Sequence, residues 1–342
     1  MKSSSLLRTA SESFRRGHDL SPSVTKPFLD ALITESDEEI LAGIFLAWNA
    51  KGIAEDEIYE IAKIMRERCT KVQSKHETFV DIVGTGGSKV KTFNVSTAAA
   101  FVVAGAGVPV AKHGNKAATS NSGSADVLSA LGIEPAVDGA IAERCLEEIG
   151  ICFMYAPNFH RLSPTLAKVR RGLGFPTIFN CVGPLANPAN PPHQLIGVWE
   201  KSLLPKMAGA LARLGTEKSW IVHGEDGLDE ISLKGRTHVA EVQGEKVKQF
   251  EISLEDFGMA ESGSKVPEVG SPLESASLIT RILKCEHRFD PVQELVLINS
   301  AAALCLTDRV ADLEAGRRVA FASVSGGHAM RKLHQLKGFV SL

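Results

Sequence analysis

Residues 1–72 show wide apolar stripes at helical spacing and no strand pattern. Ile40, Ile44 and Trp48 fall on one face of a helix, and a similar stripe follows in residues 58–65. Short helices with such stripes bury them against one another. The pattern therefore predicts a small all-helical N-terminal domain.

From residue 73 onward, short apolar runs alternate with helical patterns. The runs predicted as strands are 79–83, 108–111, 151–154 and 220–222. This alternation is typical of an α/β domain, here 73–342, with a mostly parallel central sheet flanked by helices. Ligands of such sheets bind beyond the carboxyl ends of the strands, where polar motifs follow three of these runs.

The second half of the chain adds a hairpin and three helical segments. The hairpin is predicted at 238–249. The closing helical segments are predicted at 271–285, 290–307 and 312–336, the last one interrupted at Gly326 and Gly327.

A glycine-rich turn follows the first predicted strand. Gly84, Gly86 and Gly87 let the backbone adopt positive φ and approach a ligand closely. Asn94 and Ser96 then precede an alanine- and valine-rich helix, whose N-terminus offers free N–H groups to an anion. This order predicts a phosphate or pyrophosphate site. Taken alone, the Gly-Thr-Gly-Gly motif fits a plain strand-to-helix turn better, because glycine motifs recur by chance.

Three further motifs follow in order. They are a basic and polar stretch at 110–128, a stretch at 169–188 and an acidic stretch at 223–232. Together the four motifs resemble the anthranilate phosphoribosyltransferase family over nearly the whole chain. The resemblance implies transfer of the 5-phosphoribosyl group from phosphoribosyl pyrophosphate (PRPP) to the amine of anthranilate, the second step of the tryptophan branch. It also implies that a helical segment at about 162–186 returns to pack on the helical domain.

The resemblance assigns the phosphoribosyl side of the site. Lys112, Asp229 and Glu230 are the implied catalytic residues. Ser96, Asp229 and Glu230 are the implied ligands of Mg²⁺, the expected cofactor, and carboxylate oxygens suit that ion. Without the family pattern, the two acids fit a solvated turn and Lys112 fits a surface lysine. The implied PRPP contacts are Gly84, Gly87, Ser88, Thr92, Asn94, Val95, Ser96, Thr97, Lys112, His113, Gly114, Asn115, Lys116, Ala117, Ala118, Thr119, Ser120 and Ser124.

Anthranilate carries a carboxylate beside its amine. A planar guanidinium matches a carboxylate, and Arg170 stands at the family's anthranilate-binding arginine. The resemblance adds Gly84, His113 and Asn115 as further anthranilate contacts. The amine is neutral at pH 7 and the transition state resembles an oxocarbenium ion, so catalysis should rest on positioning and charge stabilisation.

The chain departs from the family pattern at several positions. Ser88 stands where most members carry aspartate, Lys116 replaces a usual arginine, and Pro176 replaces a usual basic residue. Lys89 and Lys91 make the glycine loop more basic. These departures bear on substrate affinity and magnesium handling more than on the reaction class.

Composition and charge narrow the function. The 342 residues are 44% hydrophobic and carry a net charge of −2, which gives no general reason to expect nucleic-acid binding. No apolar run reaches the roughly 18 residues of a membrane span. We expect small-molecule substrates, no nucleic acid, no membrane and a homodimer through the helical domain. Reduced thiols and a cytoplasmic location are favoured because no metal spacing joins Cys69, Cys145, Cys152, Cys181, Cys285 and Cys305.

Two alternative functions stay open at this stage. A pyrimidine nucleoside phosphorylase on the same fold would cleave a glycosidic bond with phosphate and need no paired metal carboxylates. A non-catalytic relative that binds nucleic acid should lose Arg170 and carry a clear positive charge. Asp229, Glu230 and the motif at 112–115 favour the transferase.

Overall fold

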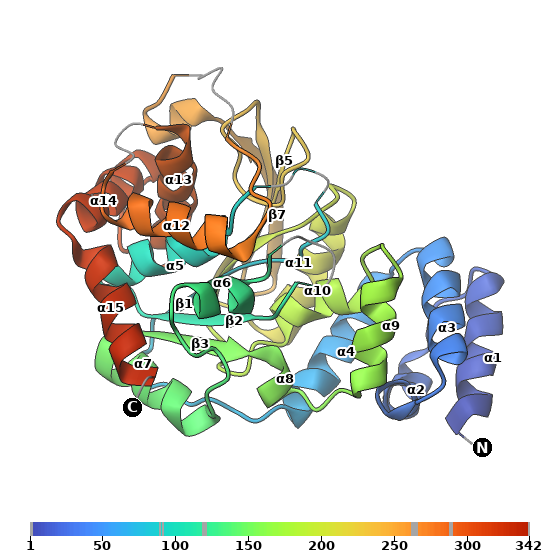
Figure 1. Cartoon of the computed structure of the whole chain (residues 1–342). Helices are drawn as coiled ribbons and strands as arrows, with labels where there is room; N and C mark the ends of the chain where they lie inside the picture. Colours follow the sequence, from blue (N-terminus) through green and yellow to red (C-terminus); the bar gives the residue numbers. More distant parts are fainter. Residues whose placement is uncertain are drawn as a thin grey trace.

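The computed structural model describes residues 3–88, 90, 92–117, 122–260, 266–286 and 290–340. Four helices open the chain and stand to one side of a larger body built on a sheet (Figure 1). Asp37 caps the third of them by accepting hydrogen bonds from the amides of Glu39 and Ile40. The four helices are α1 (Ser3–Arg15), α2 (Pro22–Thr34), α3 (Glu38–Lys51) and α4 (Glu55–Arg68).

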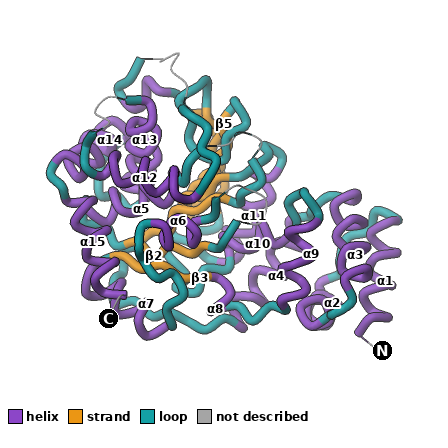
Figure 2. The backbone as a smooth tube through the Cα atoms, viewed as in Figure 1, coloured by secondary structure: helices purple, strands orange, loops and turns teal. Residues whose placement is uncertain are grey.

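One seven-stranded sheet forms the centre of the larger body, and helices lie on both of its sides (Figure 2). The strand order is β3-β2-β1-β4-β5-β6-β7. The first five strands pair in parallel and the last two are antiparallel, which confirms the predicted mostly parallel α/β class. The strands are β1 (Val80–Gly84), β2 (Val110–Gly114), β3 (Ile151–Tyr155), β4 (His193–Gly197), β5 (Lys218–Gly224), β6 (Thr237–Gln243) and β7 (Lys246–Ile252).

Two strands extend further than predicted and include residues that were expected to follow them. Lys112 and His113 lie inside β2, and His223 lies inside β5. All three side chains are buried, so the expectation that these polar residues follow the strands was wrong. The apolar run of each strand ends before the strand does, because the last residues of the strand carry polar side chains that do not belong to the apolar core.

Strand β4 was missed by the apolar pattern. His193 and Gln194 begin it, and both are buried. Gln194 donates from Nε2 to the carbonyl oxygen of Pro184 at 2.9 Å, and the Nδ1 atom of His193 lies 3.1 Å from the carbonyl oxygen of Lys218. These partners satisfy one nitrogen of each side chain, whereas Gln194 Oε1 has no partner among the described residues.

The remaining predicted elements are confirmed. The hairpin is β6–β7, and the last three predicted helical segments form four helices with the expected break at Gly326 and Gly327. The helices after β1 are α5 (Val95–Gly105), α6 (Ser124–Ala130), α7 (Gly139–Ile149), α8 (Ala156–Phe159), α9 (Pro164–Gly172), α10 (Ile178–Leu185), α11 (Leu203–Leu214), α12 (Pro272–Leu283), α13 (Pro291–Leu306), α14 (Leu313–Ser325) and α15 (His328–Val340), with a 3₁₀ turn at Leu254–Phe257.

Two apolar cores lie on opposite faces of the sheet. Ile82 and Leu195 point into the core formed with α5, α7 and α13, whereas their neighbours Val83 and Ile196 point into the core formed with α4, α10 and α11. This alternation is the two-residue period of a strand. The second core also contains the apolar residues of α1–α3 and α9, so the N-terminal helices are packed continuously with one face of the sheet. Within the described ranges, no helix has the length and apolar character required to cross a bilayer.

Candidate active site

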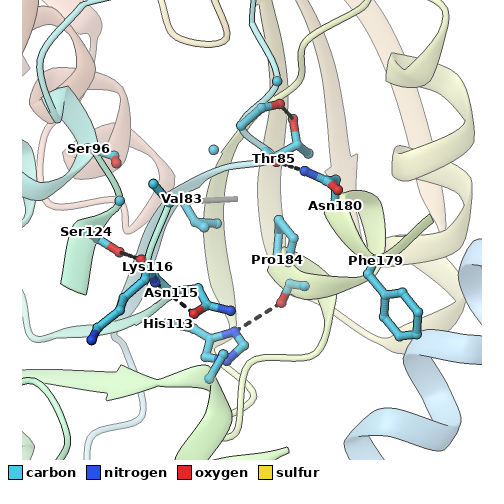
Figure 3. A pocket seen from close by; sticks show the side chains of 18 of the residues that line it. Val83, Thr85, Ser96, His113, Asn115, Lys116, Ser124, Phe179, Asn180 and Pro184 are labelled. Carbon is cyan, nitrogen blue, oxygen red and sulfur yellow. Dashed lines mark hydrogen bonds between the residues drawn. The ribbon is translucent and has the colours of Figure 1, made fainter. Parts of the chain in front are cut away.

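A cavity of about 540 Å³ opens at the carboxyl ends of the central strands. Its walls come from the ends of β1 and β2, the start of α5, the helices α9 and α10, and the loop after β5. Figure 3 shows side chains from the ends of β1 and β2, the start of α5 and helix α10 around it, and residues of α9 and of the loop after β5 also line it. The four sequence motifs therefore meet at one place in the fold.

The glycine turn is pinned to the neighbouring strand. Thr85 donates from its backbone N–H and its Oγ1 to the carbonyl oxygen of Gly197, at 2.8 and 3.1 Å. Gly87 has a φ of 83° and a Cβ there would overlap Pro176, so only glycine fits. Ser88 donates from Oγ to the carbonyl oxygen of Gly227 at 2.9 Å, which ties the turn to the acidic loop.

The start of α5 is held by three segments. The Oδ1 atom of Asn94 accepts from Ser122 Oγ at 3.0 Å and from Ser275 Oγ at 2.9 Å. Its side chain makes no capping bond to α5 itself, and the backbone of Ser96 hydrogen-bonds the carboxylate of Glu230. The helix N-terminus thus points at negative charge, as expected of an anion site.

Buried charges cluster below this helix start. Lys112 is 4% exposed, and its Nζ donates to the carbonyl oxygen of Ile82 and to Ser96 Oγ at 3.3 Å. Burial and the neighbouring carboxylate of Asp229 raise the pKa of Glu230 to about 8. Burial lowers the pKa of Lys112, whereas the Asp81 and Glu230 carboxylates act to raise it.

The polar groups here fit a magnesium ion that is held jointly by the protein and by the phosphates of a substrate. Asp229 faces the turn, with Oδ2 3.2 Å from the position of a Cβ on Gly84. The carboxylate of Glu230 interacts with that of Asp229, and both Glu230 and the hydroxyl of Ser96 lie near Lys112. The described residues contain no group of three or more acids, histidines or cysteines able to hold a metal alone. Mg²⁺ commonly uses one or two carboxylates with substrate phosphates.

Two buried histidines contact each other at the wall formed by β2 and α8. His113 and His160 lie edge to face with ring centroids 5.1 Å apart, and His113 Nδ1 is 3.0 Å from the carbonyl oxygen of Gly183. Burial lowers the pKa of His113 to about 3 and that of His160 to about 4, so both are neutral at pH 7. Both Nε2 atoms are buried and lack a hydrogen-bond partner among the described residues.

Arg170 is a half-buried cation on α9, at the wall formed by α9 and α10. Its Nε donates to Thr177 Oγ1 at 3.1 Å, its Nη2 donates to Asn180 Oδ1 at 3.4 Å, and its guanidinium lies 5.0 Å from the Phe179 ring centroid. No carboxylate pairs with Arg170 among the described residues. Burial lowers its pKa to about 10, so the guanidinium stays charged at neutral pH. A positive charge oriented in a cavity without a protein anion is suited to a carboxylate ligand.

The structure brings most of the predicted site residues to the cavity. Thr97 is buried on α5 outside the cavity lining. Ala118, Thr119, Ser120, Lys89 and Lys91 lie outside the described residues. The predicted residues that line the cavity are Gly84, Gly87, Ser88, Thr92, Asn94, Val95, Ser96, Lys112, His113, Gly114, Asn115, Lys116, Ala117, Ser124, Arg170, Asp229 and Glu230.

Some residues of the site had no role assigned from sequence. Asn180 donates from Nδ2 to the carbonyl oxygen of Thr85 at 2.9 Å and so joins α10 to the glycine turn (Figure 3). Its signal was an amide three residues after Thr177, the pattern of a helix cap. Ser275 of α12 gave no such signal, because its partner Asn94 is 181 residues away in the chain.

Comparison with known proteins shows which class of protein this chain belongs to. The sequence pattern of a family described as "Glycosyl transferase family, a/b domain" matches residues 76–330. Among curated relatives, anthranilate phosphoribosyltransferase of Anaeromyxobacter dehalogenans is 45% identical over 296 residues, covering 86% of this chain and 87% of the relative. That of Symbiobacterium thermophilum is 40% identical over 335 residues, covering 98% and 96%.

Solved structures agree with these relatives. Anthranilate phosphoribosyltransferase from Thermus thermophilus superposes with a TM-score of 0.87 at 34% identity, over 97% of this chain and 99% of that one. The Saccharomyces cerevisiae enzyme in complex with PRPP and Mg gives 0.86 at 29% identity, with 98% of each chain covered. The fold and the site therefore define a glycosyltransferase. Within that class, the chain belongs to the anthranilate phosphoribosyltransferase family.

Proposed function

We propose that the cavity is the active site in which the 5-phosphoribosyl group of PRPP is transferred to the amine of anthranilate. The products are N-(5-phosphoribosyl)anthranilate and pyrophosphate. The proposal rests on a single observation, the lining of this cavity. A glycine turn and two adjacent carboxylates line one part of it, and an arginine that pairs with no carboxylate among the described residues lines another. Yeast structures named for PRPP with Mg and for 4-fluoroanthranilate support both halves.

The phosphoribosyl half is assigned to the strand ends and the start of α5. Backbone amides of the turn and the hydroxyl of Ser96 are suited to hold phosphate oxygens, because helix N-termini and glycine turns offer free N–H donors. Lys112 supplies the buried cation next to them. Asn94 keeps this helix start fixed through its bonds to Ser122 and Ser275.

The remaining predicted PRPP contacts belong to the same proposal. They rest on position in the cavity wall or on the family match. Thr97 and the residues at 118–120 rest on the family match alone. The proposed set is Gly84, Gly87, Ser88, Thr92, Asn94 to Thr97, Lys112 to Ser120 and Ser124.

The metal of the family is Mg²⁺, and Ser96, Asp229 and Glu230 are proposed to hold it. When bound, the ion offsets the charge of the departing pyrophosphate. The raised pKa of Glu230 reflects two carboxylates in a dry place. The protein's own contribution is to keep both acids oriented toward the glycine turn.

The acceptor half is assigned to Arg170, with Gly84, His113 and Asn115 as further contacts. A fork of N–H donors on the carboxylate fixes the ring, so the neutral amine is presented to the anomeric carbon without a strong base. His113 contacts the carbonyl oxygen of Gly183 on α10, the same helix whose Asn180 accepts from Arg170. Positioning and charge stabilisation then account for the rate, as expected for an oxocarbenium-like transition state.

One assay tests the function directly. Purified protein is mixed with PRPP, Mg²⁺ and anthranilate, and the loss of anthranilate fluorescence is followed. Consumption that needs all three components is expected. Absence of consumption, or consumption without PRPP, contradicts the proposal.

The proposal extends to the domain division, the dimer and the location. We propose a helical domain of residues 1–72 with the returning segment 162–186, and an α/β domain of 73–342. The packing of α9 against α3 supports the return. The exposed Leu46, 55% accessible on α3, supports a homodimer through the helical domain. Free cysteines among the described residues support a cytoplasmic location.

A further inference from the structure

Arg66 is a buried cation on α4, 8% exposed. Its Nε donates to the carbonyl oxygen of Leu185 at 2.5 Å, and its Nη1 donates to the carbonyl oxygen of Leu214 at 3.2 Å and to Asn190 Oδ1. In the part of the chain that the structure describes, no carboxylate pairs with it. Burial lowers the pKa of Arg66 to about 10, so it is charged at neutral pH.

Both carbonyl acceptors are helix ends. Leu185 is the last residue of α10, and Leu214 is the last residue of α11. The final carbonyls of a helix lack intrahelical donors and carry partial negative charge. One guanidinium therefore satisfies two helix C-termini. Helix α10 has no basic residue of its own in its last turn, so Arg66 supplies that charge from another helix.

Helix α10 needs such support. It spans only Ile178–Leu185 and contains Gly183 and Pro184, two residues of low helix propensity. A helix this short is not stable by itself, so its position depends on tertiary anchors. The Arg66 guanidinium is the anchor at its C-terminal end.

The same helix carries the acceptor half of the active site. Asn180 and Phe179 contact the Arg170 guanidinium, and the carbonyl oxygen of Gly183 orients His113. Arg66 does not line this cavity and faces a separate hollow of about 610 Å³.

We infer that Arg66 is a positioning residue for the aromatic-acid half of the pocket. It holds the C-terminal end of α10 and, through that helix, the places of Arg170 and His113. The glycine turn, the start of α5 and the carboxylate loop are held mainly by other bonds, from Gly197, Ser275 and Asn299 respectively. Arg66 should therefore affect the two substrates unequally. This inference rests on the proposed function of the cavity.

The test compares Arg66→Met, which keeps the volume, with Arg66→Lys, which keeps the charge. The matched control is Arg68→Met, on the same helix, where the half-exposed Arg68 pairs with Asp30. For Arg66→Met we expect the KM for anthranilate to rise about tenfold or more and the KM for PRPP to stay within about twofold. Arg66→Lys should lie between, because an ammonium cannot form the same fork of bonds. The control should match the wild type.

A second measurement removes the effect of general instability. Arg66→Ala opens the anchor position to the hollow, and ethylguanidinium at non-denaturing concentration should lower its KM for anthranilate toward the wild-type value. Ethylammonium should not do so. Equal losses for both substrates that follow the melting temperature, or an unchanged KM in Arg66→Met, overturn the inference. Wild-type protein that consumes no anthranilate overturns the proposed function and this inference together, whereas active wild type with a normal Arg66→Met overturns the inference alone.

Discussion

At the scale of single residues, Arg170 is oriented for an anion by the protein alone. Thr177 and Asn180 hold one edge of its guanidinium, and the ring of Phe179 lies beneath it. These contacts limit the rotamers of a long side chain, so less conformational entropy is lost when a carboxylate binds.

The first prediction is that Arg170→Ala weakens anthranilate binding by roughly one to two powers of ten. A charge-assisted bond contributes about 1.5–3 kcal/mol, and about 1.4 kcal/mol is tenfold. Arg170→Lys should recover this only in part. PRPP affinity should be unchanged, because its proposed contacts lie on the glycine turn. Isothermal titration of each ligand measures both, with the exposed Lys168→Ala as control; unchanged anthranilate affinity would contradict the assignment.

The second prediction concerns Gly197. A Cβ at this position would overlap the backbone carbonyl oxygen of Asp229, and the carbonyl oxygen of Gly197 also holds Thr85. Gly197→Ala should displace the acid or the turn and reduce turnover by about a hundredfold, since misplacement by about 1 Å can have that effect. The exposed Gly338→Ala on α15 is the control. A variant with normal kcat and normal Mg²⁺ dependence would show that the contact is not needed.

At the scale of elements, the loop between β5 and β6 is held at both ends. Gly224 donates from its N–H to the carbonyl oxygen of Leu228 at 2.8 Å, and Ile231 donates from its N–H to Asn299 Oδ1 at 3.0 Å. Ser88 holds the middle through Gly227. The loop can therefore present two acids to the cavity with little freedom.

The third prediction is that Asp229→Asn with Glu230→Gln gives a folded protein whose turnover falls by roughly 10²–10³-fold or more, as for loss of a main electrostatic group. The fold should survive, because burial already raises the pKa of Glu230 to about 8 and a neutral amide fits that place. Turnover against Mg²⁺ concentration and circular dichroism check the two claims. Glu225→Gln in the same loop should behave like the wild type. Near-normal turnover at saturating Mg²⁺ would exclude the metal role.

At the scale of the whole molecule, the two buried histidines couple stability to pH. The folded-state pKa values of His113 and His160 are about 3 and about 4, below the ordinary 6.5. The unfolded chain binds these protons near pH 6.5 and the folded chain does not. Stability is therefore lost as pH falls below about 6.5, by up to about 1.4 kcal/mol per pH unit for each histidine.

The fourth prediction follows from this coupling. Between pH 7 and pH 5 the free energy of unfolding of His160→Phe should fall less than that of the wild type, by about 1–2 kcal/mol. Denaturant unfolding at each pH measures the difference, which includes the smaller effect of His160 on the pKa of His113. The exposed His18→Gln is the matched histidine control. Identical pH dependence in His160→Phe and the wild type would show that His160 is not held neutral.

The sequence predicts those parts of the molecule that depend on local patterns. The stripe around Trp48, the break at Gly326 and the turn at Gly84 were correct because period and turn chemistry are local properties. Strand β4 could not be predicted, since Gln194 becomes compatible with a central strand only when Pro184 accepts its bond. Arg66 gave no signal, because its acceptors lie more than a hundred residues away in the chain.

The strand order affects how the sequence of this protein can diverge in evolution. The connections after β1 run toward β2 and β3 on one face of the sheet, and those after β4 run toward β5 on the other, so direction and face both reverse between β1 and β4. Gly84 and Gly197 are paired in register at this reversal and leave its floor bare. The donor side is built on the backbone of the sheet, whereas the acceptor side is attached through α9 and α10. Divergence can therefore alter the accepted amine by changes in those two helices, whereas the floor is constrained because a side chain at Gly197 would overlap the backbone of Asp229.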